Sequence, residues 1–166
     1  MSVTLYASVT LHVLAALLWL GGMFFLGIVG APVLRSIEPP ELRARLFHAL
    51  GLRFRAVGWV AIAVLVITGV TNLWARGLLR WDGVLGNADF WRTTFGHVLA
   101  IKLGAVTAMI AVSFVHDFVH GPAAGRVAAG SPEATAMRTR AAGLARWNAL
   151  LGVLVVVCAV WLARGS

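Results

Sequence analysis

Apolar residues are gathered along the chain into four long runs, and charged residues lie almost entirely between the runs. The first run extends from about Val3 to Val33 and contains no Asp, Glu, Lys or Arg. An apolar run of about 18 residues or more is long enough to cross the hydrocarbon core of a bilayer as a helix. The pattern therefore predicts four membrane-spanning helices, at about residues 5–29, 54–74, 91–118 and 144–162.

Residues typical of helix boundaries refine this pattern. Pro39-Pro40-Glu41 predicts a helix start, because proline suits the first turn and an acidic residue suits its positive end. We expect a short helix here, lying in the membrane interface between spans one and two, with one apolar face: Leu42, Leu46, Ala49 and Leu50. Pro32 is expected to end the first span and Asp89 to cap the third. Ser131-Pro132-Glu133 is expected to begin a helix that leads into the fourth.

The composition agrees with a protein embedded in lipid. Hydrophobic residues make up 60% and charged residues 12% of the chain, and the mean hydropathy is +0.89. A soluble domain is about half apolar and about a quarter charged, so this chain has too little polar surface for a water-soluble globule. We therefore predict an all-α fold, an integral membrane four-helix bundle in a lipid bilayer, forming a single transmembrane domain over residues 1–166.

The basic residues predict the orientation in the membrane. Nine arginines lie in the connections that follow spans one and three: Arg35, Arg43, Arg45, Arg53, Arg55, Arg126, Arg138, Arg140 and Arg146. Four lie toward the opposite side: Arg76, Arg80, Arg92 and Arg164. Because basic residues concentrate on the cytoplasmic side, both termini are predicted outside an inner (plasma) membrane, in the periplasm if the host is bacterial. The net charge of +8 is thus a topology signal, and no nucleic-acid partner is expected.

His12 is the single ionisable residue in the middle of the first apolar run, and such a residue inside a membrane span points to a functional site. With a rise of about 1.5 Å per residue, His12 lies roughly 10 Å and His97 roughly 9 Å below the outer ends of spans one and three. Two imidazoles at equal depth on parallel helices suit the axial positions of a b-type heme in a helical bundle. A stripe of small residues beside His97 would leave room for the macrocycle: Gly96, Ala100, Gly104 and Ala108.

Further candidates surround this pair. Trp19 shares a helix face with His12, and Asn72 ends the second span at a similar level, together with Thr68 and Thr71. Lys102 is expected to pair with a heme propionate or an acidic substrate, or else to extend toward water. His48 and His116 lie toward the cytoplasmic side and are candidates for a second heme or a quinone site. Each histidine has a plainer alternative, a hydrogen bond to a neighbouring helix.

Several motifs resemble the copper resistance protein D (CopD-like) family of membrane proteins. They are His12 with Trp19-Leu20-Gly21-Gly22-Met23, Arg53-Phe54-Arg55, Thr68-Gly69-Val70, Phe95-Gly96-His97 with Lys102, and His116-Asp117-Phe118. The resemblance implies copper handling or import. A more distant likeness, carried by His12 and Lys102, is to the HemJ-type protoporphyrinogen oxidases, which implies heme binding.

The preferred prediction is a membrane electron-transfer protein with a bis-histidine heme b held by His12 and His97 in the outer half of the bundle. A quinone or a periplasmic redox partner would accompany it, and a quinol-linked or heme-dependent oxidoreductase activity is left open. The alternative is a copper-binding membrane protein of copper transport or resistance, because imidazole and thioether groups bind copper. A third hypothesis is a structural subunit whose histidines only pack against neighbouring helices.

Overall fold

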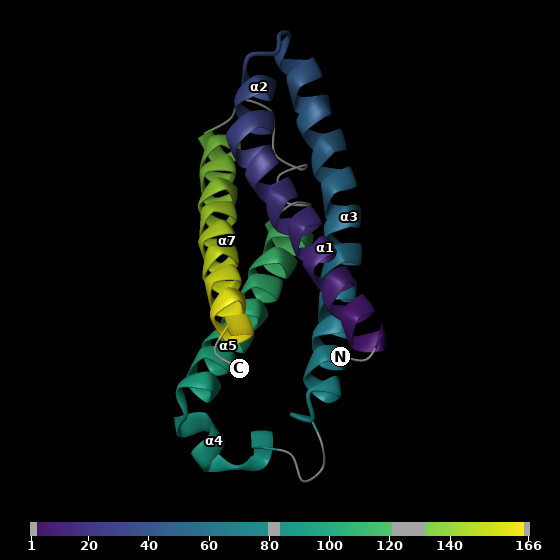
Figure 1. The fold of residues 1–166 in the computed structure, drawn as a ribbon. Coiled ribbons are helices and arrows are strands. Elements are labelled where there is room, and N and C mark those ends of the chain that lie inside the picture. The colour runs from purple at the N-terminus through teal and green to yellow at the C-terminus, as the bar shows by residue number, and fades with distance from the viewer. Residues whose placement is uncertain (1–2, 80–83, 121–131, 165–166) are drawn as a thin grey trace. The chain divides into compact units, whose positions relative to one another are not determined.

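The structure is a computed structural model that describes residues 3–79, 84–120 and 132–164. These residues are almost entirely helical, and no strand occurs among them (Figure 1). Helical segments long and apolar enough to cross a membrane cover Val3–Arg35, Pro40–Ala75, Thr94–Val119 and Thr139–Arg164. The prediction of an all-α membrane protein with four spans is therefore confirmed.

The first span continues past the proline that was expected to end it. Helix α1 (Val3–Phe25) leads into a π-helical turn, η1 (Leu26–Gly30), and then into α2 (Ala31–Arg35). Proline lacks an N–H group and crowds the carbonyl four residues before it, so it fits poorly inside a regular α-helix. The π-turn widens the helix directly before Pro32, with the N–H of Ala31 donating to the carbonyl of Leu26. Pro32 then occupies the first turn of α2, where its missing N–H costs little.

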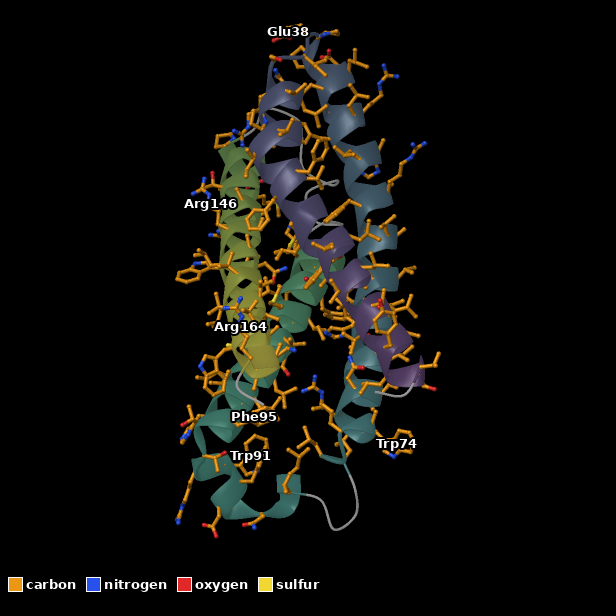
Figure 2. The ribbon with its side chains drawn as sticks, in the orientation of Figure 1. Glu38, Trp74, Trp91, Phe95, Arg146 and Arg164 are labelled. Carbon is orange, nitrogen blue, oxygen red and sulfur yellow. The ribbon has the colours of Figure 1, made fainter. Side chains whose placement is uncertain are left out.

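Helix α3 (Pro40–Ala75) begins at the expected proline but does not stop after a short segment. The helix predicted to lie in the interface is the first part of this single 36-residue helix, and its placement in the interface stays a prediction. The turn before it, which includes Glu38 (Figure 2), is closed by the Arg43 guanidinium. Its Nη1 donates to the carbonyls of Arg35 and Ile37, at 3.2 and 3.5 Å, and approaches the Glu38 carboxylate at 3.5 Å.

The third span begins with two helices instead of one. After η2 (Val84–Gly86), a short helix α4 (Ala88–Arg92) is capped by Asn87, whose side chain accepts from the N–H of Asp89. Asp89, which was expected to cap the third span, is therefore not a cap; it lies in the first turn of α4. Thr93 ends α4 and caps α5 (Thr94–Phe114), because its hydroxyl accepts from the Gly96 N–H at 3.0 Å. A second π-helix, η3 (Val115–His120), follows α5.

The last helix, α7 (Pro132–Arg164), starts at the proline that the sequence indicated. Ser131, the expected cap, lies outside the described residues.

The chain divides into two compact units, residues 1–86 and 87–166, each built around one antiparallel helix pair. In the first unit α1 packs on α3, and its core includes Ala15, Trp19, Ala61 and Ile62. In the second unit α5 packs on α7, with a core that includes Leu99, Ala105, Met109, Cys158 and Leu162. The outward faces are apolar as well, as Leu14, Leu18 and Phe25 illustrate with more than half of each side chain exposed, which is what a lipid environment requires.

Candidate functional site

His12 projects from α1 onto α3 within the first unit. Its Nδ1 lies 2.8 Å from the Thr68 hydroxyl oxygen, and its side chain is half-buried. The ring rests on Gly69, where a Cβ atom would lie 3.5 Å from the imidazole Cε1. Because glycine has no side chain, the imidazole can lie directly against the α3 backbone. The expectation that the polar end of span two reaches the level of His12 is met at Thr68.

Other polar groups gather around this contact, and we call Ser8, His12, Thr68 and Asn72 the α1–α3 polar cluster. The Ser8 hydroxyl donates to the Thr68 carbonyl at 3.4 Å. Asn72 lies one turn beyond Thr68 on the same face of α3, and its Oδ1 is buried without a hydrogen-bond partner in the described part of the chain. The Thr71 hydroxyl instead donates to a carbonyl of its own helix, that of Ile67. The role of Asn72 in cofactor binding stays a prediction.

Trp19 lies on the same side of α1 but serves the helix interface. It is 9% exposed, and its indole lies against Gly58 of α3, at 3.6 Å from the position a Cβ would take. At about 1.5 Å per residue it is roughly 10 Å along α1 from His12, so one small ligand cannot touch both side chains closely.

His97 belongs to the second unit and lies in the first turn of α5. Its Nδ1 is 2.9 Å from the Thr93 carbonyl oxygen, and its side chain is exposed. A carbonyl oxygen only accepts, so Nδ1 carries the hydrogen and Nε2 carries the lone pair. Because α5 begins at Thr94, His97 lies about 5 Å from its helix start, whereas His12 lies about 14 Å from the start of α1. That the two histidines lie at equal depth in the membrane stays a prediction.

Lys102 and His97 occupy different faces of α5. Five residues at about 100° each place them roughly 140° apart around the helix axis. Lys102 is half-buried on the side that carries Leu99, Met109 and Ser113 toward α7. The small-residue stripe near His97 is divided: Gly96 is buried against the Phe90 carbonyl, whereas Ala100, Gly104 and Ala108 are exposed.

Aromatic side chains fix the junction that carries His97. Phe90 of α4 meets Trp91 and Phe95 edge-on, with ring centroids 5.2 and 6.1 Å apart. Figure 2 labels Trp91 and Phe95 on either side of the break between α4 and α5. Tryptophan at such a position is typical of the boundary between hydrocarbon and headgroups. The backbone carbonyl that orients His97 is therefore part of a well-anchored turn.

The remaining candidate histidines, His116 and His48, lie toward the other ends of their spans. His116 lies in η3, where its Nδ1 is 2.9 Å from the Asp117 carboxylate, and 42% of its side chain is exposed. His48 lies on the exposed side of α3 in the first unit. Within the described residues of either unit, no group of three or more His, Cys, Asp or Glu side chains is arranged to hold a metal ion. A second heme or a quinone site at His48 and His116 stays a prediction.

One buried polar contact lies outside every predicted site. The Asn148 side-chain amide donates to the Ser113 hydroxyl at 3.0 Å between α7 and α5, and the two residues are 5% and 9% exposed. A polar residue within each of two apolar runs was the available signal, since such residues commonly bond across membrane helices. Which polar residues of the two runs contact each other depends on how the helices pack.

A comparison with known protein families decides the relationship of this chain. Residues 48–162 match the family described as copper resistance protein D. The chain belongs to this family. The resemblance drawn from its motifs is therefore confirmed, and together with the four apolar helices it identifies a multi-pass membrane protein of the copper resistance protein D family.

The copper resistance protein D match covers some of the candidate residues and not others. His48, Asn72, His97, Lys102 and His116 lie inside the matched stretch, whereas His12 and Trp19 precede it. The chain is also 30% identical to an uncharacterized protein of Aquifex aeolicus (strain VF5), over 112 residues. That similarity covers 67% of this chain and 66% of the relative's length. No solved structure matches the chain.

Proposed function

We propose that this protein handles copper in the membrane as its transported or sequestered substrate, with His12 and His97 as imidazole ligands. The observation that supports this most directly is the hydrogen bonding of their rings. Each Nδ1 is engaged by a group of its own unit, Thr68 for His12 and Thr93 for His97. A metal-binding histidine typically engages one ring nitrogen in this way, and Nε2 is then the coordinating atom.

The donor chemistry favours copper among the common divalent ions. Imidazole ligands bind Cu(II) more strongly than the other first-row divalent metals, so a site with few ligands can still prefer copper. Met23 lies about 16 Å along the helix from His12, so thioether binding at Met23 would form a separate site.

A b-type heme is the second candidate, with His12 and His97 as the predicted bis-histidine ligands. The exposed small residues near His97 favour it, because Ala100, Gly104 and Ala108 would let a flat macrocycle approach α5. A bound heme would supply one-electron chemistry, with a quinone or a periplasmic protein as the partner. A quinol-linked or heme-dependent oxidoreductase activity would be compatible with this candidate. Lys102 lies on another face of α5 than His97, so a propionate would have to reach around the helix to pair with it.

Measurements on one purified protein distinguish the copper proposal from the heme proposal. We would measure bound copper by elemental analysis and record the visible spectrum of the protein expressed with both copper and heme supplied. The copper proposal expects copper in the wild type, less in His12→Ala and in His97→Ala, and an unchanged amount in the control His48→Ala. A strong Soret band that His12→Ala removes would favour heme instead. Copper content equal in all four proteins would contradict the assignment of both histidines.

We also propose that both termini lie outside an inner (plasma) membrane. The support is the nine-to-four distribution of arginines between the two sides of the predicted spans. With this orientation the α1–α3 polar cluster and His97 would each lie toward the outer end of their helices.

A further inference from the structure

Thr68 has one hydroxyl hydrogen and three neighbours that its oxygen approaches. The Oγ1 atom lies 2.6 Å from the Val64 carbonyl oxygen, 3.4 Å from the Leu65 carbonyl oxygen, and 2.8 Å from Nδ1 of His12. Two oxygens approach to such a short distance only with a hydrogen between them. The Val64 carbonyl has no hydrogen to give, so the Thr68 hydroxyl donates to it.

The consequence for His12 follows from counting donors. With its hydrogen directed at Val64, the Thr68 oxygen can only accept from the imidazole, so Nδ1 of His12 is the donor. We infer that Thr68 is a positioning residue that holds His12 in the Nδ1–H tautomer and thereby makes Nε2 the electron-pair donor. The metal-binding part of this inference rests on the proposed function, whereas the tautomer itself does not.

The surroundings of Thr68 fix this arrangement from several directions. Thr68 is 7% exposed, so water does not compete for its hydroxyl. Ser8 donates to the Thr68 carbonyl and thus holds α1 at this level of α3. Gly69 lets the imidazole lie against the backbone, at 3.5 Å from where a Cβ would be.

His97 reaches the same tautomer by an independent route. There a backbone carbonyl, that of Thr93, accepts from Nδ1. Two histidines in separate units are therefore held with the same nitrogen, Nε2, in its basic form. Orientation by a second residue is what distinguishes a prepared metal ligand from a histidine that only fills space.

The test is solid-state ¹⁵N NMR of the full chain in lipid vesicles, labelled at the histidine rings, without metal and above the pH at which imidazoles protonate. Subtracting the spectrum of His12→Gln identifies the His12 signals. The variants are Thr68→Val, which keeps the shape and removes the acceptor, Thr68→Ser, which keeps the hydroxyl, and the control Thr71→Val. Thr71 lies on the same helix, and its hydroxyl bonds to the Ile67 carbonyl.

We expect a protonated Nδ1 at His12 in the wild type, in Thr68→Ser and in Thr71→Val, and a shift toward protonated Nε2 in Thr68→Val. A wild-type His12 with Nε2 protonated, or a Thr68→Val spectrum equal to the wild type, would overturn the inference. Circular dichroism checks that each variant keeps its helix content, and Thr68→Ser tests the hydroxyl even if the valine variant is poorly folded.

Copper titration of the same proteins tests the link to function separately. Loss of the orienting partner of a metal-bound histidine typically weakens metal affinity by about 10- to 100-fold. The copper affinity of Thr68→Val should therefore be lower than that of the wild type by a factor in this range. Failure of the wild type to bind copper would contradict the proposed function and leave the tautomer result standing. Wild-type copper binding with an unshifted tautomer in Thr68→Val would contradict the role of Thr68.

Discussion

The contact between Gly22 and Phe54 offers a sharp test of the α1–α3 interface. A Cβ atom added at Gly22 would lie 2.5 Å from Cε2 of the Phe54 ring and 3.3 Å from its Cζ. Ordinary carbon contacts begin at about 3.5 Å, so in Gly22→Ala the ring edge must move by about 1 Å or the helices must separate. Inserting one carbon into a packed interface costs about 1–3 kcal/mol, so we expect the free energy of unfolding of Gly22→Ala to lie below that of Gly21→Ala by this amount.

The adjacent glycine provides the control. A Cβ at Gly21 would meet nothing within 4 Å, so Gly21→Ala adds no clash at a neighbouring position of the same helix. Because alanine favours helix by up to about 1 kcal/mol over glycine, this variant should be as stable as the wild type or more stable.

The assay for this pair is equilibrium unfolding of the purified protein in mixed micelles, followed by circular dichroism. Adding Phe54→Leu to Gly22→Ala removes the edge of the ring, so the double variant should lose less stability than the two single changes added together. Equal stability of Gly22→Ala and Gly21→Ala would refute the close approach of α1 and α3 at this point.

Three further predictions concern the second unit and the topology. Ser113→Ala removes the acceptor of the α5–α7 hydrogen bond and should lower the free energy of unfolding by about 0.6–2 kcal/mol. The control Thr107→Ala loses only a bond to its own helix and should have a smaller effect, so equal losses in the same unfolding assay would contradict the interhelical role. Cys158 is 6% exposed and should react with a maleimide slowly in mild detergent and quickly after denaturation; rapid labelling of the folded protein would show that the α5–α7 core is not closed. To test the topology, single cysteines are introduced at His48 or at Asp89 in a Cys158→Ser background, and intact cells are treated with an impermeant thiol reagent. The cysteine at position 48 should be protected and the one at position 89 labelled, whereas the reverse pattern would place the termini in the cytoplasm.

Much of the fold could be predicted from the sequence because membrane spans are defined by the length of apolar runs. The boundaries depended on local hydrogen bonds that composition does not describe. Pro32 was expected to stop a helix, but a π-turn accommodates it. Asp89 is a good capping residue by type, yet Asn87 and Thr93 stand at the positions where backbone N–H groups are open.

The candidate site was predicted in part for a related reason. Counting residues along the spans brought Thr68 to the level of His12, and the structure joins them. Depth along a helix does not give direction around it. Lys102 lies on another face of α5 than His97, and its pairing with a propionate or an acidic substrate stays a prediction. The hydroxyl network of Thr68 needed atomic distances, because only these decide which group donates.

The π-turn at Leu26–Gly30 has a consequence for how this span tolerates change in length. A π-turn equals an α-helix with one residue inserted, so everything after it is rotated by about 100° compared with an unbroken helix. That phase shift brings the Arg35 carbonyl to the side where it accepts a hydrogen bond from the Arg43 guanidinium, at 3.2 Å. Deletion of one residue from this turn would restore an ordinary helical phase and turn the carbonyl away. The span would still cross the bilayer, but the end of α2 would lose its hydrogen bond to Arg43 of α3.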